Sequence, residues 1–211
     1  MLRAAACLAA AGLAVAAPAV AQTRSAPPGP WVLDVRGATS PVPADAAFYP
    51  TLDAAAFLPT RGYGLEVGAH VYLFDMGPAR VGAGGSFVQV RATSGPDEGS
   101  ADPSATPVSQ RLTLNMRIIA PQVSFNFGSR DGWSYVSAGA GTATVETRTE
   151  AVLPGARESG GLFAWDVGGG ARWFLKSRFA IGFDVRLHRI ASGTSTPSTT
   201  FVSVSAGISI R

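Results

Sequence analysis

The chain has 211 residues, of which 46% are hydrophobic and only 15% are charged, with a net charge of +3. The apolar content excludes an intrinsically disordered chain, and beyond residue 21 no uncharged run of 18 apolar residues remains to form a membrane-spanning helix. The basic residues are scattered and include one lysine, Lys176, so the clustered charge of a nucleic-acid-binding protein is missing and we expect no nucleic-acid partner.

The first 21 residues have the pattern of a secretory signal peptide. Arg3 supplies a positive start, an apolar run of mainly Ala, Leu and Val occupies residues 4–17, and Ala19-Val20-Ala21 fits the small-residue rule for cleavage. The apolar run is too short to span a bilayer comfortably. We therefore expect a signal peptide over residues 1–21 and one exported domain over residues 22–211.

Beyond the signal peptide, apolar residues recur at every second position, which indicates β-strands. Eight segments show this alternation or approach it: 31–38, 64–74, 80–91, 111–127, 133–148, 163–176, 179–188 and 202–210. In the clearest of them, 163–176, Phe163 and Trp165 fall on one face, whereas Asp166 and Arg172 fall on the other. One apolar and one polar face are therefore expected for each strand.

Three of the segments are less regular. In segment 111–127 the apolar residues change parity near Ala120-Pro121, and we expect a β-bulge there to restore the alternation. Segment 80–91 is rich in glycine and changes parity near Phe87-Val88. Segment 133–148 contains so much Gly, Ala and Thr that its two faces cannot be assigned.

The connections between these segments alternate in length. Three are tight and rich in Gly, Asp, Pro or Ser: 75–79, 128–132 and 176–178. Four are longer: 40–61, 93–110, 147–160 and 191–198. In an up-and-down arrangement every long connection would lie at one end of the sheet and every tight turn at the other.

This layout resembles the eight-stranded outer-membrane β-barrels of the OmpA transmembrane-domain and OmpX type, over nearly the whole exported domain. Members of that family have short periplasmic turns and long external loops. They usually end on an aromatic residue, whereas this chain ends Ile208-Ser209-Ile210-Arg211. The resemblance implies an all-β, eight-stranded antiparallel up-and-down transmembrane β-barrel in the bacterial outer membrane, in contact with outer-membrane lipid and monomeric.

Alternation alone leaves two orientations open, with the apolar face toward lipid or toward an enclosed core. A soluble periplasmic barrel of lipocalin type, holding an apolar ligand, would place that face inward. We favour lipid, because the polar face is mostly small, the single lysine suits no soluble exterior, and large aromatic residues mark strand ends. These aromatic residues are Trp31, Phe127, Trp133, Tyr135, Phe163, Trp173 and Phe179.

With the apolar face outward, charged residues point into a narrow lumen. We expect the lumen network to contain Asp34, Arg36, Glu66, His70, Arg117, Asp166, Arg172, Asp184, Arg186 and His188. Burying an unpaired charge costs several kcal/mol, so acidic and basic members should pair and leave a plugged barrel without an open pore. No metal site is expected, because Glu66 and His70 lie roughly 13 Å apart along one strand face.

A lipid A-modifying enzyme is the third interpretation. Lipid A deacylases of this fold carry a His-x-Ser pair as base and nucleophile. Here His70 is followed by Val71-Tyr72, and His188 by Arg189-Ile190, so neither matches. We therefore expect no enzyme, no catalytic residue and no cofactor.

The first long connection is the most distinctive, because it contains four large apolar residues. Phe48, Tyr49, Phe57 and Leu58 could form a contact site for a surface partner. Folding of the connection over the barrel mouth is the interpretation we favour for these residues. The function expected from the sequence is a structural or surface-interaction role through the long external loops.

Overall fold

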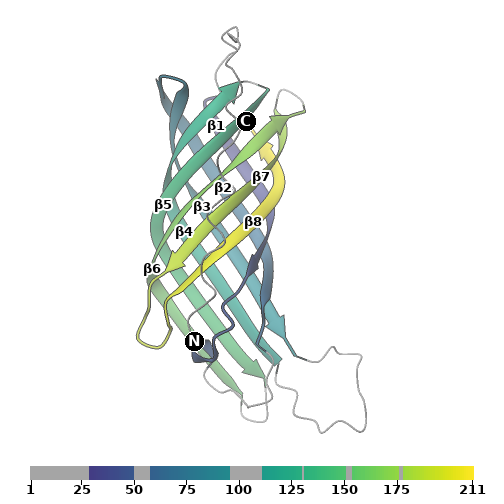
Figure 1. Cartoon of the computed structure of the whole chain (residues 1–211), viewed down its shortest axis with the longest axis vertical. Helices are drawn as coiled ribbons and strands as arrows, with labels where there is room; N and C mark the ends of the chain where they lie inside the picture. Colours follow the sequence, from purple (N-terminus) through teal and green to yellow (C-terminus); the bar gives the residue numbers. More distant parts are fainter. Residues whose placement is uncertain (1–28, 50–57, 96–110, 130, 151–153, 176–177) are drawn as a thin grey trace, which may run out of the picture.

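Eight antiparallel strands close into one barrel, in which each strand pairs with its sequence neighbours and β1 pairs with β8 (Figure 1). The computed structural model describes residues 29–49, 58–95, 111–129, 131–150, 154–175 and 178–211. The elements are β1 (Trp31–Pro41), η1 (Ala46–Phe48), β2 (Arg61–Met76), β3 (Ala79–Ser94), β4 (Arg111–Ser129), β5 (Gly132–Glu150), β6 (Gly155–Phe174), β7 (Phe179–Ile190) and β8 (Thr199–Ile210). This confirms the predicted fold class. The predicted signal peptide over residues 1–21 lies outside the described residues.

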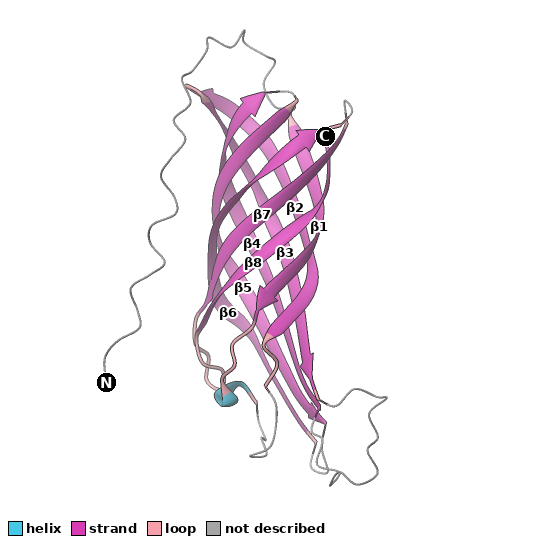
Figure 2. Ribbon diagram, turned by 45° about the vertical axis from the view of Figure 1, so that its right-hand side comes forward, coloured by secondary structure: helices cyan, strands magenta, loops and turns pink. Residues whose placement is uncertain are grey.

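The two ends of the barrel differ. The turn end carries the β2–β3, β4–β5 and β6–β7 connections together with the C-terminus, and the loop end carries the other connections. Figure 2 shows the short 3-10 helix η1 at the loop end, opposite the C-terminus. Within the described residues, no helix is long and apolar enough to cross a membrane.

The barrel wall is higher on one side. Strands β4, β5 and β6 have 19, 19 and 20 residues, whereas β1, β7 and β8 have only 11 or 12. The prediction of a long connection over 147–160 is wrong, because β5 continues to Glu150 and β6 begins at Gly155. Alternating Thr147 and Thr149 point into the barrel there, which extends the strand pattern beyond the apolar residues.

Strand β4 carries no bulge. Its register against β3 runs without a shift from Ala79↔Phe127 to Ser94↔Leu112, so the predicted bulge at Ala120-Pro121 is wrong. The change of parity is real, because Ile118 is 2% exposed and points inward, whereas Ile119 is 59% exposed and points outward. The apolar residues of one regular strand therefore move from the inner face to the outer face along its length.

The outer surface near the turn end is an apolar belt. Its exposed aromatic side chains include Trp31, Phe127, Phe163, Trp165, Trp173, Phe179 and Phe183. Aliphatic side chains such as Val35, Val71, Val123 and Ile208 fill the surface between them, each about half exposed. An apolar outer surface of this extent suits contact with lipid acyl chains.

Candidate functional site: the barrel interior and its outer wall

An aromatic cluster occupies the turn end of the interior. The cluster consists of Val32, Tyr72, Trp133 and the partly buried Phe174. The Trp133 ring lies 4.7 Å from the Phe174 ring and 5.9 Å from the Tyr72 ring, measured between centroids. The Arg211 guanidinium lies 3.7 Å from the Phe174 centroid, in position for a cation–π contact. We call Val32, Tyr72, Trp133 and Phe174 the turn-end aromatic cluster.

The prediction that Trp133 and Tyr135 face lipid is wrong. Both side chains are buried inside the barrel, and Tyr135 donates a hydrogen bond to Asp184 Oδ2 at 2.7 Å. An aromatic residue near a strand end marks the lipid boundary only where neighbouring apolar residues fix the face. Strand β5 lacks such residues, so its aromatic side chains gave no indication of direction.

A central ion-pair network follows next along the barrel axis. Its charged members are Asp34, Arg36, Glu66, Asp166, Arg172, Asp184 and Arg186, and all are buried. Arg172 donates two hydrogen bonds to Asp34, from Nε to Oδ1 at 2.8 Å and from Nη2 to Oδ2 at 2.6 Å. Arg36 joins Asp34 at 2.8 Å and Glu66 at 3.3 Å. The bidentate pair fixes both side chains geometrically.

The second half of the central ion-pair network is centred on Arg186. Its guanidinium pairs with Asp166 and with Asp184, the latter at 3.1 Å, and donates to Ser137 Oγ at 2.8 Å. Gln122 Nε2 donates to Asp166 Oδ1 at 2.8 Å. These contacts join side chains from β4, β5, β6 and β7 inside the barrel.

Nine of the ten residues predicted to line the lumen are buried inside it, and Arg117 is not. Arg117 is half exposed on the outer wall, so its prediction is wrong. Its placement depended on the assumption that β4 keeps its apolar face outward throughout. At Arg117 the inner neighbours are Met116 and Ile118, and the charged side chain points away from them.

The two buried histidines occupy different surroundings. His70 has no hydrogen-bond partner for either ring nitrogen among the described residues. His188 lies 2.9 Å from Ser203 Oγ through Nε2, and its ring stacks on Phe201 with 4.9 Å between centroids. His188 and Ser203 form a base–hydroxyl pair, but both are at most 1% exposed.

Several polar members of the interior were absent from the sequence prediction. Tyr135, Ser137 and Gln122 each bond a charged member of the central ion-pair network. Gln122 was recognisable, because it alternates with the outward residues Val123 and Phe125. The other two lie on β5, where the sequence does not distinguish the faces.

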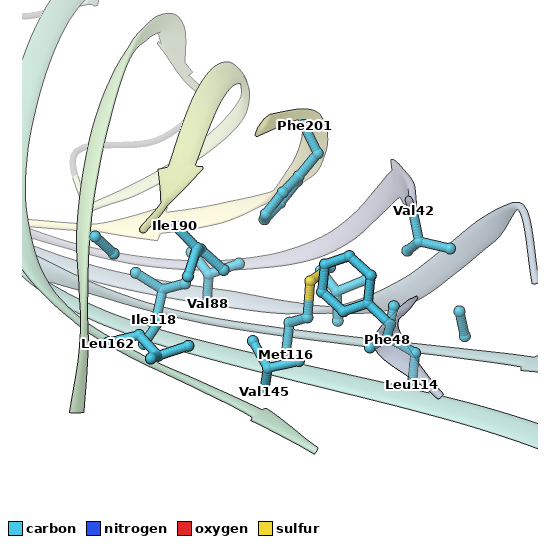
Figure 3. Close-up of a cluster of buried hydrophobic side chains, with 14 of the residues drawn as sticks. Val42, Phe48, Val88, Leu114, Met116, Ile118, Val145, Leu162, Ile190 and Phe201 are labelled. Carbon is cyan, nitrogen blue, oxygen red and sulfur yellow. The ribbon is translucent and has the colours of Figure 1, made fainter. Parts of the chain in front are cut away.

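An apolar core fills the loop end of the interior. It contains 17 buried residues, among them Val88, Leu112, Leu114, Met116, Ile118, Val145, Leu162, Ile190 and Phe201. Phe48 and Tyr49 from the first connection belong to it, and Leu58 packs against it. Figure 3 shows the Phe48 ring beside Met116 and Leu114. We call these residues the loop-end apolar core.

The first connection therefore folds over the barrel mouth, as favoured from the sequence, although Phe57 lies outside the described residues. Arg157 holds this arrangement from the rim of β6. Its Nη1 donates to the carbonyl oxygens of Ala47 and Ser195, at 3.0 and 2.9 Å. One guanidinium thus joins η1 to the connection between β7 and β8.

The outer wall at the loop end carries an outer-wall polar patch, defined by Gln89, Arg91, Asn115, Arg117, Glu146 and Arg148. A shallow cavity of about 320 Å³ lies over these residues, with Thr113 and Glu150 at its edge. Arg148 Nη2 contacts Glu146 Oε1 at 2.7 Å. The hydrogen bond from Arg148 holds the pKa of Glu146 below its usual range.

The described residues offer no metal site, since none of their His, Cys, Asp and Glu side chains gather in groups of three or more suited to an ion. The polar atoms of the interior are instead arranged as ion pairs and hydrogen bonds. Chemically, the interior is organised to neutralise charge, and the outer wall presents the more accessible polar groups.

Comparison with known proteins identifies the same architecture. Residues 5–209 match the family model of the outer membrane protein β-barrel domain. No curated protein sequence matches the chain significantly.

Two of the solved structures similar to the chain are of Ail, the attachment invasion locus protein of Yersinia pestis. The structure of Ail alone shows 14% identity and a TM-score of 0.53, covering 85% of this chain and 96% of that chain. Ail in complex with the heparin analogue sucrose octasulfate shows 13% identity and a TM-score of 0.52, with the same coverage. The Neisserial surface protein A shows 10% identity and a TM-score of 0.49, covering 86% and 97%. At these identities the Ail structures support the fold alone.

Proposed function

We propose that this chain, which belongs to the outer-membrane protein β-barrel family, is a closed barrel with a structural or surface-interaction role at its loop end. It resides in the bacterial outer membrane, as its family does, so the soluble periplasmic alternative is set aside. The single observation that carries the proposal is the filling of the interior. The turn-end aromatic cluster, the central ion-pair network and the loop-end apolar core follow one another along the axis.

A transport role has little support in this interior. An eight-stranded barrel is just wide enough for side chains to fill, and wider barrels are needed for an aqueous channel. Here the side chains that would line a channel bond one another across the axis, such as Arg172 and Asp34. Solutes would have to break these pairs and then cross the loop-end apolar core.

An enzymatic role also has little support. The base–hydroxyl pair of His188 and Ser203 is the one arrangement noted above that resembles an acyl-transfer centre. It is buried beneath Phe201 in the loop-end apolar core, where a lipid substrate has no route to it. The pair is better explained as a satisfied contact between neighbouring strands β7 and β8.

Partners are therefore expected at two surfaces, outer-membrane lipid around the apolar belt and a surface partner at the loop end. The family pattern of short periplasmic turns and longer external loops supports a loop end that faces outside the cell. A closed barrel leaves no free strand edge for pairing with another copy, which supports a monomer.

Conductance through planar bilayers tests the closed interior. We expect the purified barrel to form no stable open channel, because its ion pairs and apolar core obstruct the whole axis. A large porin reconstituted in the same bilayers is the positive control. Reproducible ohmic openings of the unmodified barrel would refute the proposal of a closed barrel.

Cysteine labelling tests the orientation. The single native cysteine, Cys7, lies in the predicted signal peptide, so introduced cysteines report cleanly. Glu150→Cys at the loop end should react with an impermeant maleimide on intact cells. The matched Pro78→Cys at the turn end should react only after the outer membrane is permeabilised. The opposite labelling pattern would place the loop end in the periplasm.

A further inference from the structure

We propose that the outer-wall polar patch binds the phosphate group of a phosphorylated glycolipid headgroup in the membrane around the barrel. The inference goes beyond the proposed function and shares with it only the outer-membrane location. Three features of the patch support such binding: its height on the wall, two arginines with few partners, and the amide side chains between them.

The height of the patch matches the region of lipid headgroups. On the outer face of β3 and β4, Phe87 pairs with Ile119 at the top of the apolar belt. The next outward pair toward the loop end is Gln89 with Arg117. This pair lies only about 7 Å further along the strands. Lipid whose acyl chains contact Ile119 therefore brings its headgroup to Arg117.

Two guanidinium groups are available there. Arg91 forms no hydrogen bond or ion pair in the part of the chain that the structure describes. The Arg117 side chain is 48% exposed, and its one ion pair with another described residue is a 3.9 Å contact with Glu146. Arg91 pairs with Asn115, so Arg117 is its diagonal neighbour on the same face, at about 7–8 Å. Guanidinium groups at this separation can converge on one phosphate, which they bind through paired N–H donors.

The rest of the outer-wall polar patch keeps these arginines accessible. Glu146 accepts hydrogen bonds from Arg148 Nε at 2.9 Å and from Asn115 Nδ2 at 3.5 Å. Gln89 Nε2 in turn donates to Asn115 Oδ1 at 3.4 Å. Because Arg148 already neutralises Glu146, the carboxylate competes weakly for Arg117. The amides of Gln89 and Asn115 are suited to hydroxyl groups of a saccharide beside the phosphate.

The adjacent apolar belt favours a lipid over a soluble anion. A headgroup anchored by acyl chains reaches the outer-wall polar patch already concentrated at the membrane surface. A soluble phosphorylated sugar would have to bind an open cavity of about 320 Å³ without that anchoring. The occupant to which the structure points is therefore a membrane glycolipid.

Native mass spectrometry of the full barrel in detergent tests the site. The probes are a bisphosphorylated lipid A and the same lipid after enzymatic dephosphorylation. The double variant Arg91→Ala/Arg117→Ala should weaken retention of the phosphorylated lipid by about thirtyfold. This factor corresponds to a loss of about 1 kcal/mol for each arginine near an anionic lipid. The matched control Arg61→Ala/Arg178→Ala removes the same charge from exposed positions outside the patch and should leave retention unchanged.

Three results would overturn the inference. These are equal retention of both lipids by the unmodified barrel, equal loss in both double variants, and binding of a soluble sulfated sugar but of neither lipid. The measurement in detergent does not depend on orientation or on conductance. Its failure is therefore distinguishable from a failure of the proposed function.

Discussion

The turn half and the loop half of this barrel are built on opposite patterns. In the turn half, ion pairs such as Arg172 with Asp34 lie inside and the apolar belt lies outside. In the loop half, Leu114 and Met116 lie inside, and the outer-wall polar patch lies outside. One continuous set of strands thus satisfies two environments by exchanging the roles of its faces.

The exchange follows from what surrounds each half. Where lipid contacts the wall, apolar side chains gain little by turning inward, and the narrow interior is left to mutually paired polar groups. Where water contacts the wall, the hydrophobic effect drives apolar side chains into the interior, as in a soluble barrel. On β4 the exchange takes only a few residues. On the outer face the polar Arg117 is followed by the apolar Ile119, and on the inner face the apolar Ala120 is followed by the polar Gln122.

The largest expected effect comes from breaking the interior of the turn half. Replacing Asp34→Ala leaves Arg172 and Arg36 buried without their shared carboxylate, at a cost of about 3–5 kcal/mol in the free energy of unfolding. Urea unfolding in lipid vesicles measures it. The pair of the exposed Asp75 with the partly buried Arg80 is the control, and Asp75→Ala should cost at most about 1 kcal/mol. Equal losses in the two variants would contradict a central ion-pair network.

A second substitution tests whether the loop-end apolar core stabilises the loop half. Leu114→Ala should lose about 2–5 kcal/mol, because Leu114 is fully buried and its removal leaves a cavity. On the same strand, Ile119→Ala removes an outward side chain and should have a much smaller effect. The same unfolding assay applies. A larger loss at Ile119 than at Leu114 would mean that the faces do not exchange.

The space for a Cβ atom differs between glycines of the two halves. A Cβ atom at Gly170, in the turn half, would overlap the carbonyl oxygen of Phe183 on the neighbouring strand. Gly170→Ala should therefore cost about 1–3 kcal/mol through forced backbone movement. Gly160→Ala, on the same strand in the loop half, meets only Thr144 Oγ1 at 3.7 Å and should be tolerated. Identical unfolding midpoints would argue against close strand packing in the turn half.

The smallest effect on global stability is expected at the rim. Arg157→Ala removes the two exposed hydrogen bonds that join η1 to the β7–β8 connection, each contributing only about 0.5 kcal/mol. The barrel should unfold at nearly the same urea concentration, while limited proteolysis cuts the first connection faster. Arg157→Lys is the control for charge, because its ammonium group cannot reproduce both contacts with the same geometry. Unchanged proteolysis in both variants would show that the apolar contacts of Phe48, Tyr49 and Leu58 hold the connection without Arg157.

Much of the fold was predictable from alternation and from the spacing of turns. The eight strands follow from the alternating segments, and Phe163 and Trp165 fix which face of segment 163–176 is apolar. Closure into a barrel came from the resemblance to eight-stranded outer-membrane barrels. The error at Arg117 came from assuming one orientation for every strand. Periodicity reports which residues share a face, but it does not report what that face touches. The change of parity near Ala120-Pro121 was visible, and its cause was an exchange of environment instead of a bulge.

The candidate site was predictable only in part. Charged residues on strands with clear faces, such as Asp34 and Arg186, could be placed by alternation alone. Tyr135 and Ser137 could not, because β5 is built from small residues that fit either side. The cross-barrel pairing of Arg172 with Asp34 joins residues 138 positions apart, and only closure of the barrel brings them together. The spacing of the two residues in the sequence therefore could not predict that contact.

The exchange of faces also determines how deeply the protein is immersed. Sinking by one residue pair would carry Arg117 into hydrocarbon, and rising by the same step would remove Ile119 from contact with acyl chains. Each arginine moved toward the bilayer midplane costs up to about 2–4 kcal/mol. Vertical drift is penalised in both directions, so rim and connections stay at a constant elevation above the lipid.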